Sequence, residues 1–210
     1  LNYVQIKLTN KSDRKILSFP NFWDGDYEFF WLQDIARNGT TPEAYKKLNL
    51  NTFVDEDYMN GGRHMIVSKA RRKGFSYKNA ALVTNTFNTE QNSYTLLCAF
   101  DKKYLYPKGI MAMVTDNMNF INEHTGWGKR RQVVDKQNHR RASYLEYVNG
   151  QPIEKGYKSE VEAITFKDNP DAARGKDASI VIFEECGAFD NLKASYLATK
   201  PAVEDGGITT

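Results

Sequence analysis

Residues 68–77 form a basic turn that separates two segments with different apolar patterns. The apolar run at residues 64–67 predicts a strand, and residues 76–87 place apolar side chains at helical spacing. A strand, a basic turn with one glycine and a helix are the layout of a phosphate-binding loop, because the start of a helix offers free N–H groups and a positive dipole end. This layout favours an α/β fold.

The turn departs from the common phosphate-loop pattern G-x-x-x-x-G-K-[ST], because Phe75 stands where a lysine should follow Gly74. Lys69, at the start of the turn, is long enough to bring its charge back over the same cavity. Gly74 would let the backbone approach a phosphate, and the Ser76 hydroxyl stands where a magnesium ligand is expected. The candidate nucleotide contacts are Lys69, Arg71, Arg72, Lys73, Gly74, Phe75, Ser76 and Tyr77. A solvated basic surface is the alternative interpretation.

A second signal lies about a hundred residues downstream, at residues 178–185. Four consecutive large apolar residues followed by Glu184 and Glu185 predict a buried parallel strand that delivers two carboxylates to the crevice above a sheet. In a nucleotide-hydrolysing site, Glu184 would hold Mg²⁺ together with Ser76, and Glu185 would orient and polarise the attacking water. A strand that simply ends at a polar surface is the alternative.

The ordered set of these segments resembles the large terminase subunits of tailed bacteriophages. The set comprises the deviant loop at residues 69–76, a strand before the Asn149-Gly150 turn, the Arg174-Gly175 pair and the double-glutamate strand. The likeness covers roughly residues 60 to 190. It implies a RecA-like P-loop NTPase core with a mainly parallel sheet, helices on both faces, antiparallel additions and an N-terminal extension.

The resemblance also implies a function, which we state as an expectation. The chain would be the ATPase motor domain that hydrolyses ATP, with Mg²⁺, to translocate double-stranded viral DNA into the procapsid. Its partners would be the portal protein, the small terminase subunit and other copies of itself in a ring, in the host cell cytoplasm at the procapsid portal. A helicase-like P-loop motor and a nucleic-acid-binding domain without catalysis are the competing hypotheses.

Arginines are candidates for contacts with the γ-phosphate, where one such side chain can accelerate phosphoryl transfer by about a thousandfold. Arg72 is the first choice for a catalytic role, because the terminase resemblance places an arginine at that step of the loop. Arg71 and Arg174 follow, the latter as a candidate sensor or finger. Each could instead pair with a nearby carboxylate.

A basic segment begins after Gly126, with Trp127 interleaved among the charges. The formal net charge of the chain is only +3, so local clustering matters more than the overall field. The candidate DNA-phosphate contacts are Lys129, Arg130, Arg131, Arg140 and Arg141. A solvated basic loop explains the same residues.

The length of 210 residues and the 40% apolar content allow one sizeable domain. We expect an extension at residues 1–60 and the ATPase domain at residues 61–210, ending before a coupling motif and a nuclease domain, so that DNA cleavage is not expected. Cys98 and Cys186 lack metal-ligand spacing and suggest reduced thiols. No apolar run is long enough to span a membrane, and no membrane partner is expected.

The remaining elements are predicted from periodicity and from capping residues. Helices are expected at residues 27–37, before Asn38-Gly39, and at residues 42–48, with Thr41 as the cap. A buried strand at residues 94–100, a helix at 110–123 and antiparallel strands at 143–148 and 161–166 complete the prediction. Gln33 could read the edge of an adenine base beside an aromatic cluster, although packing explains that cluster better.

Overall fold

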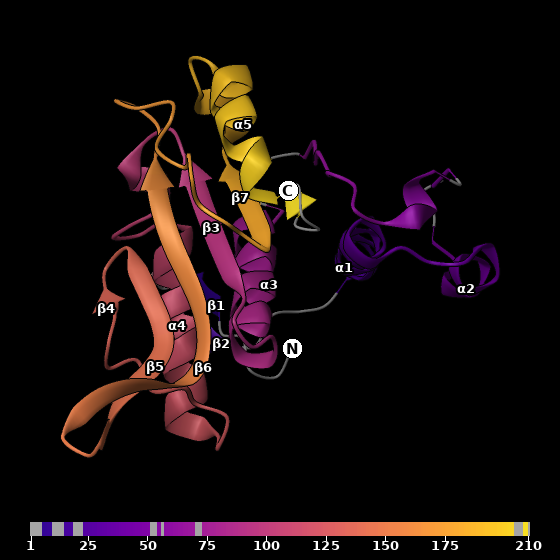
Figure 1. Ribbon diagram of the computed structural model, residues 1–210. Coiled ribbons are helices and arrows are strands. Elements are labelled where there is room, and N and C mark those ends of the chain that lie inside the picture. The colour runs from indigo at the N-terminus through magenta and orange to yellow at the C-terminus, as the bar shows by residue number, and fades with distance from the viewer. Residues whose placement is uncertain are drawn as a thin grey trace.

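The computed structural model describes residues 6–9, 15–18, 23–50, 54–55, 57–69, 73–203 and 208–209. A six-stranded sheet lies at its centre, in the order β4-β5-β6-β3-β7-β8 (Figure 1). The strands are β3 (Tyr94–Ala99), β4 (Asp135–Lys136), β5 (His139–Val148), β6 (Gln151–Thr165), β7 (Ile180–Glu184) and β8 (Ile208–Thr209). Arg71 and Arg72, two of the predicted phosphate contacts, lie outside the described residues.

The sheet has a parallel part and an antiparallel part. Strands β6, β3, β7 and β8 run parallel to one another. Strand β5 pairs antiparallel with β6, and β4 pairs antiparallel with β5, at one edge of the sheet. Ala99 is paired with both Thr165 and Glu184, so β3, β6 and β7 all end at the same edge of the sheet. The expected mainly parallel sheet with antiparallel additions is therefore confirmed.

Helices cover both faces of the parallel strands. On one face, α3 (Phe75–Thr89) and α4 (Ile110–His124) pack their apolar stripes on Leu97 of β3 and Ile182 of β7 (Figure 1). On the other face, Cys98 and Phe183 meet the segment that contains α5 (Leu192–Thr199). Successive strand side chains point to opposite faces, so an apolar run such as β7 can be buried on both sides.

The smaller elements follow the predicted capping signals. Helix α1 spans Asp24–Asn38 and ends at Gly39, whose positive φ of 76° is open to glycine without steric cost. Helix α2 spans Pro42–Leu48, and the Thr41 hydroxyl accepts a hydrogen bond from the Ala44 N–H at 3.2 Å. Within the described ranges, the remaining elements are a separate two-stranded sheet and four short 3₁₀ turns: β1 (Ile6–Thr9), β2 (Lys15–Ser18), η1 (Tyr58–Asn60), η2 (Lys102–Tyr104), η3 (Cys186–Ala188) and η4 (Lys200–Val203).

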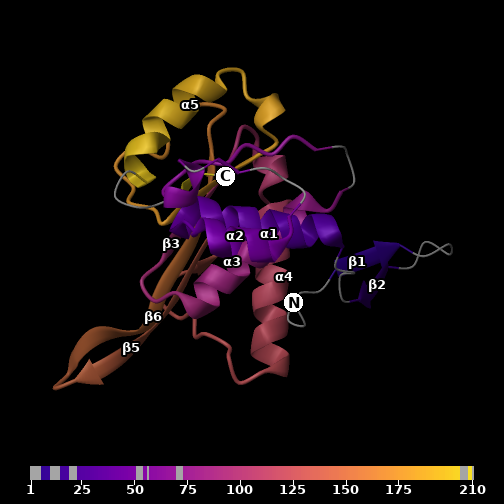
Figure 2. The same ribbon diagram turned by 90° about the vertical axis from the view of Figure 1, so that its right-hand side faces the viewer.

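Helix α1 is attached directly to α3, and Figure 2 shows the two helices close together. The Lys78 ammonium lies 2.6 Å from Asp26, and both side chains are nearly buried. The Phe29 and Phe75 rings meet edge to face at 5.2 Å between centroids. The N-terminal segment therefore packs on the helix that follows the basic turn.

The strand expected at residues 64–67 is absent, and this prediction was wrong. These residues have no regular secondary structure, and the Ile66 side chain is 98% exposed. A strand forms only where a neighbour completes its hydrogen-bond ladder. Within the described part of the sheet, the outermost neighbour on this side is β8, which contributes two residues and pairs only with β7. The segment instead passes α5, where the rings of His64 and Tyr196 meet at 5.8 Å.

None of the helices in the described ranges combines the length and apolar character that a bilayer crossing requires.

Candidate functional site

The candidate site lies where α3 begins and β7 ends. Gly74 caps α3 with φ 71° and ψ 17°, and apart from its chain neighbours no described residue has an atom within 4 Å of where its Cβ would be. The first intrahelical bond runs from the Lys78 N–H to the Gly74 carbonyl at 3.1 Å. The N–H groups of residues 75–77 precede that bond and have no acceptor within the helix. The first turn of α3 therefore presents N–H donors beside open space, as anion binding requires.

Two side chains of α3 contact the carboxylate of Glu184. The Ser76 hydroxyl donates a hydrogen bond to Oε1, and the Asn79 Nδ2 donates to Oε2 at 3.4 Å. Residues three apart on a helix share one face, so both donors point toward the end of β7. Glu184 is only 8% exposed. The sequence thus joins two segments more than a hundred residues apart through one buried carboxylate.

Glu185 lies in a different environment from Glu184. Its backbone is left-handed, with φ 53° and ψ 55°, which is uncommon for a residue with a side chain. The side chain is 51% exposed, and its Oε1 lies 3.8 Å from the ammonium of Lys69. The turn at Glu185 separates the two carboxylates, leaving one held inside the protein and the other facing solvent beside the start of the basic turn.

The Ser76 and Glu184 oxygens fit a magnesium ion. Mg²⁺ prefers hard oxygen ligands and usually takes one or two from the protein, with water and substrate phosphates completing its shell. Across the described ranges, no group of three or more His, Cys, Asp or Glu side chains is arranged to hold a metal ion. The pair would therefore hold Mg²⁺ together with a phosphate ligand rather than as an all-protein cage.

The other loop residues lie around this centre in different ways. Lys73 is exposed, and Tyr77 is partly buried. The Phe75 ring packs toward α1, and the Lys78 ammonium lies 4.2 Å from its centroid. Arg174 is exposed in the connection between β6 and β7, where its Nη2 lies 2.8 Å from Asp171. Among the described residues, no hydrogen bond or ion pair joins Arg174 to either glutamate of the site.

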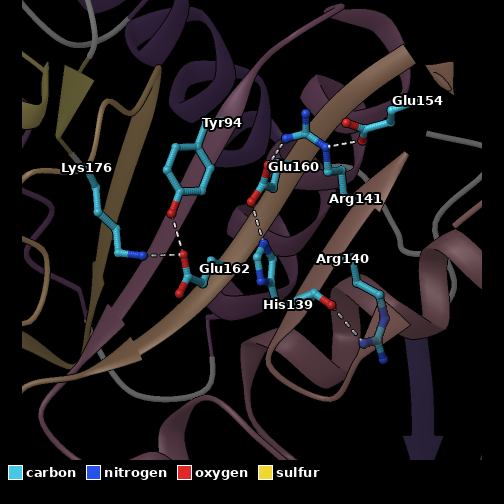
Figure 3. Close-up of polar contacts among 8 residues, drawn as sticks. All are labelled: Tyr94, His139, Arg140, Arg141, Glu154, Glu160, Glu162 and Lys176. Atoms are coloured by element: carbon cyan, nitrogen blue, oxygen red, sulfur yellow. Dashed lines mark hydrogen bonds and ion pairs between the residues drawn. The ribbon is translucent and has the colours of Figure 1, made fainter. Parts of the chain in front are cut away.

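The predicted DNA contacts fall into two groups. Lys129, Arg130 and Arg131 line an open groove of about 440 Å³ after α4. By contrast, Arg140 lies 2.7 Å from Asp135. Figure 3 shows that Arg141 of β5 bridges Glu154 and Glu160 of β6. The first group faces a hollow surface, whereas the second group neutralises acids of the sheet.

Two features were missed by sequence reasoning. Asn79 belongs to no recognisable motif. The one sequence signal for its contact with Glu184 is its position three residues after Ser76, on the same face of the helix. Glu160 and Glu162 alternate along β6 and form a polar layer with side chains of β3 and β5 (Figure 3). Gln33, which the sequence suggested as a base reader, is 5% exposed, and its Nε2 has no hydrogen-bond partner among the described residues.

Comparison with known proteins identifies the fold. No family model matches the sequence, and no curated protein matches it. The ATPase domain of the Thermus phage P74-26 large terminase, as a mutant, aligns with a TM-score of 0.51 and 16% identity over 66% of this chain and 55% of that chain. Another structure of that domain aligns with a TM-score of 0.49 and 18% identity, over 67% of this chain and 56% of that chain. The HK97 bacteriophage large terminase aligns with a TM-score of 0.46 and 13% identity, over 87% of this chain and 36% of that chain.

The first of these likenesses shows that the chain has the α/β fold of a phage large terminase ATPase domain, as the sequence predicted. The aligned region spans about half the length of that Thermus phage domain. At 16% identity this likeness shows the fold alone.

Proposed function

We propose that this chain is the ATPase motor domain of a DNA-packaging large terminase subunit, which hydrolyses ATP to move double-stranded DNA into a procapsid. The observation that carries the proposal is the contact of Ser76 with Glu184 beside the Lys69–Glu185 pair. Cationic, hydroxyl and carboxylate groups meet there at the carboxyl edge of a parallel sheet, where ligands of such folds bind.

Each group has a separate proposed role. Lys69 binds the β- and γ-phosphates, and Gly74 with the N–H groups of the first turn of α3 lines the phosphate cradle. Ser76 and Glu184 would hold Mg²⁺, which when bound neutralises charge on the phosphates. Lys73, Phe75 and Tyr77 remain candidate nucleotide contacts, and Arg71, Arg72 and Arg174 remain candidates to face the γ-phosphate.

Glu185 is proposed to orient the attacking water. In the structure it lies beside Lys69, but both side chains are partly exposed, and such pairs contribute about 1 kcal/mol at most. A bound triphosphate attracts the same ammonium more strongly, because it carries several negative charges. Phosphate binding therefore draws Lys69 away and leaves the Glu185 carboxylate available to accept a hydrogen bond from water.

The basic groove is the proposed contact with DNA. Lys129 and Arg130 lie over the rings of Tyr157 and Tyr144, at 4.5 and 5.0 Å from the ring centroids. The Arg131 guanidinium donates a hydrogen bond to Asn119 at 2.7 Å, which holds it at the groove. Contact with the portal protein, the small subunit and a ring of copies belongs to the same proposal and rests on the terminase fold.

The test compares Lys69→Ala and Glu185→Gln with the parent chain, and uses Lys46→Ala on exposed α2 as the matched control. Glu185→Gln should bind ATP with Mg²⁺ as the parent does but hydrolyse it about a hundredfold more slowly or worse, because the amide cannot accept a proton from water. Lys69→Ala should weaken ATP binding itself. Hydrolysis is measured by phosphate release and binding by a fluorescent ATP analogue.

If the parent hydrolyses ATP and both site variants match it, the assigned roles are contradicted. Parent protein that binds DNA but shows no magnesium-dependent nucleotide binding would support the nucleic-acid-binding alternative. Separation of DNA strands coupled to ATP hydrolysis would support the helicase-like alternative.

A further inference from the structure

Asn79 is one of two α3 residues that contact the carboxylate of Glu184, and Ser76 is the other. Its Nδ2 lies 3.4 Å from Oε2, while the Ser76 hydroxyl contacts Oε1. Both donors come from the first two turns of α3, and the carboxylate ends the buried strand β7. The two oxygens of one carboxylate are therefore occupied by two neutral donors on a single helix face.

This geometry restricts a torsion that is otherwise loose. The terminal torsion of a glutamate side chain has a broad, roughly two-fold preference, so the carboxylate plane turns easily when only one oxygen is held. A donor on Oε2 fixes that plane and keeps Oε1 directed at Ser76. An amide is suited to this position because it orients the carboxylate without neutralising it, whereas a lysine would compete with a cation for the same charge.

We propose that Asn79 is a positioning residue that holds Glu184 in the orientation needed to share a divalent cation with Ser76. The inference rests on the proposed nucleotide site and adds to it a residue that acts through Glu184 rather than on the substrate. Outer partners of this kind typically affect metal affinity by about 10- to 100-fold when removed.

The experiment uses Asn79→Ala and Asn79→Leu in the full chain, with Asn85→Ala as the matched control. Asn85 is an exposed asparagine of the same helix. The leucine variant keeps a similar volume but has no donor, so it separates the loss of the hydrogen bond from the opening of a cavity. Binding of a fluorescent ADP analogue is titrated at a series of Mg²⁺ concentrations and again with EDTA, and thermal unfolding confirms that each variant is folded.

Both Asn79 variants should raise the half-saturating Mg²⁺ concentration about tenfold, leave the affinity measured in EDTA unchanged, and differ in this from Asn85→Ala. A leucine variant with the magnesium requirement of the parent overturns the inference and leaves the proposed function standing. An equal loss of affinity in EDTA also overturns it, because the effect would then be general. Absence of magnesium-dependent binding in the parent chain overturns both.

Discussion

Glu185 shows how a single residue at this site departs from ordinary backbone preferences. A left-handed conformation costs a residue with a Cβ about 1–2 kcal/mol, and glycine adopts it freely. The neighbouring Glu184 adopts the extended conformation of β7 and is buried. Strain of this kind is common where a side chain must be aimed for function rather than for packing.

Replacing Glu185 with glycine should therefore increase stability while removing function. We expect the free energy of unfolding to rise by about 0.5–1 kcal/mol, since relief of the strain exceeds the extra chain entropy that glycine brings to the unfolded state. Urea denaturation measures the stability, and phosphate release measures the loss of ATP hydrolysis. A Glu185→Gly variant that is less stable than the parent would show that the Glu185 side chain contributes more to the fold than its exposed position indicates.

The attachment of α1 to α3 connects the N-terminal segment with the site. Asp26 and Lys78 form an ion pair whose side chains are 11% and 13% exposed, and the rings of Phe29 and Phe75 lie beside the Lys78 ammonium. At the other end of the two helices, Arg37 donates two hydrogen bonds to Glu90. The helix that presents the phosphate cradle is thus held along its length by α1.

Removing one partner of the buried pair should destabilise this attachment. Asp26→Asn leaves the Lys78 ammonium buried without a counter-charge, and we expect a loss of about 3 kcal/mol in the free energy of unfolding. The exposed Asp34→Asn change on the same helix is the control. Denaturant unfolding gives the stability, and a loss below about 0.5 kcal/mol would mean that water reaches Lys78 readily.

The polar layer on β5, β6 and β3 makes the sheet sensitive to pH (Figure 3). Glu162 accepts hydrogen bonds from Tyr94 and from Lys176, the latter at 2.7 Å. Burial raises the pKa of Glu162, but the hydrogen bonds from Lys176 and Tyr94 outweigh burial and leave that pKa below its usual value. Burial and the Glu162 carboxylate together raise the pKa of Tyr94, so the phenol stays protonated and continues to donate.

A lowered carboxyl pKa in the folded state has a defined sign for stability. The ionised Glu162 stabilises the fold at pH values above its unfolded pKa, and this contribution is lost as the pH falls through the folded pKa. We expect Glu162→Gln to cost about 1 kcal/mol at neutral pH and progressively less as the solution becomes acidic. Urea denaturation across this pH range measures it, with exposed Glu146→Gln as the control. A pH-independent difference would contradict the linkage.

Replacing residues of the basic groove and replacing Arg141 of β5 should change the salt dependence of DNA affinity differently. Each phosphate contact adds about 0.9 to the slope of log affinity against log salt for duplex DNA. We expect Lys129→Ala and Arg130→Ala each to reduce that slope by about one. Arg141→Ala should leave the slope nearly unchanged and lower stability instead, because Arg141 is paired with Glu154 and Glu160. Titrations of labelled duplex at several salt concentrations decide between these outcomes, and equal slopes for all three variants would contradict the groove as the contact.

Much of the architecture was predictable because its signals are local. The apolar run of β7, the Thr41-Pro42 start of α2 and the Asn149-Gly150 turn between β5 and β6 depend on side-chain periodicity and backbone preferences within a few residues. The position of Glu184 and Glu185 at the carboxyl end of β7 was also predictable from the local sequence, because the two acids directly follow the apolar run of that strand.

The remaining features depend on which segments meet across the fold. Residues 64–67 have the composition of a strand, but no strand forms without a neighbour to complete its ladder. The sequence places Phe75 in a loop, but its ring packs on α1. The sequence suggests that Arg141 is a surface cation, but it neutralises acids of β6. Asn79 reaches Glu184 only because α3 packs beside β7. Periodicity and capping act over one or two turns of chain, whereas these contacts join residues 19 to 105 positions apart, and only packing brings such residues together.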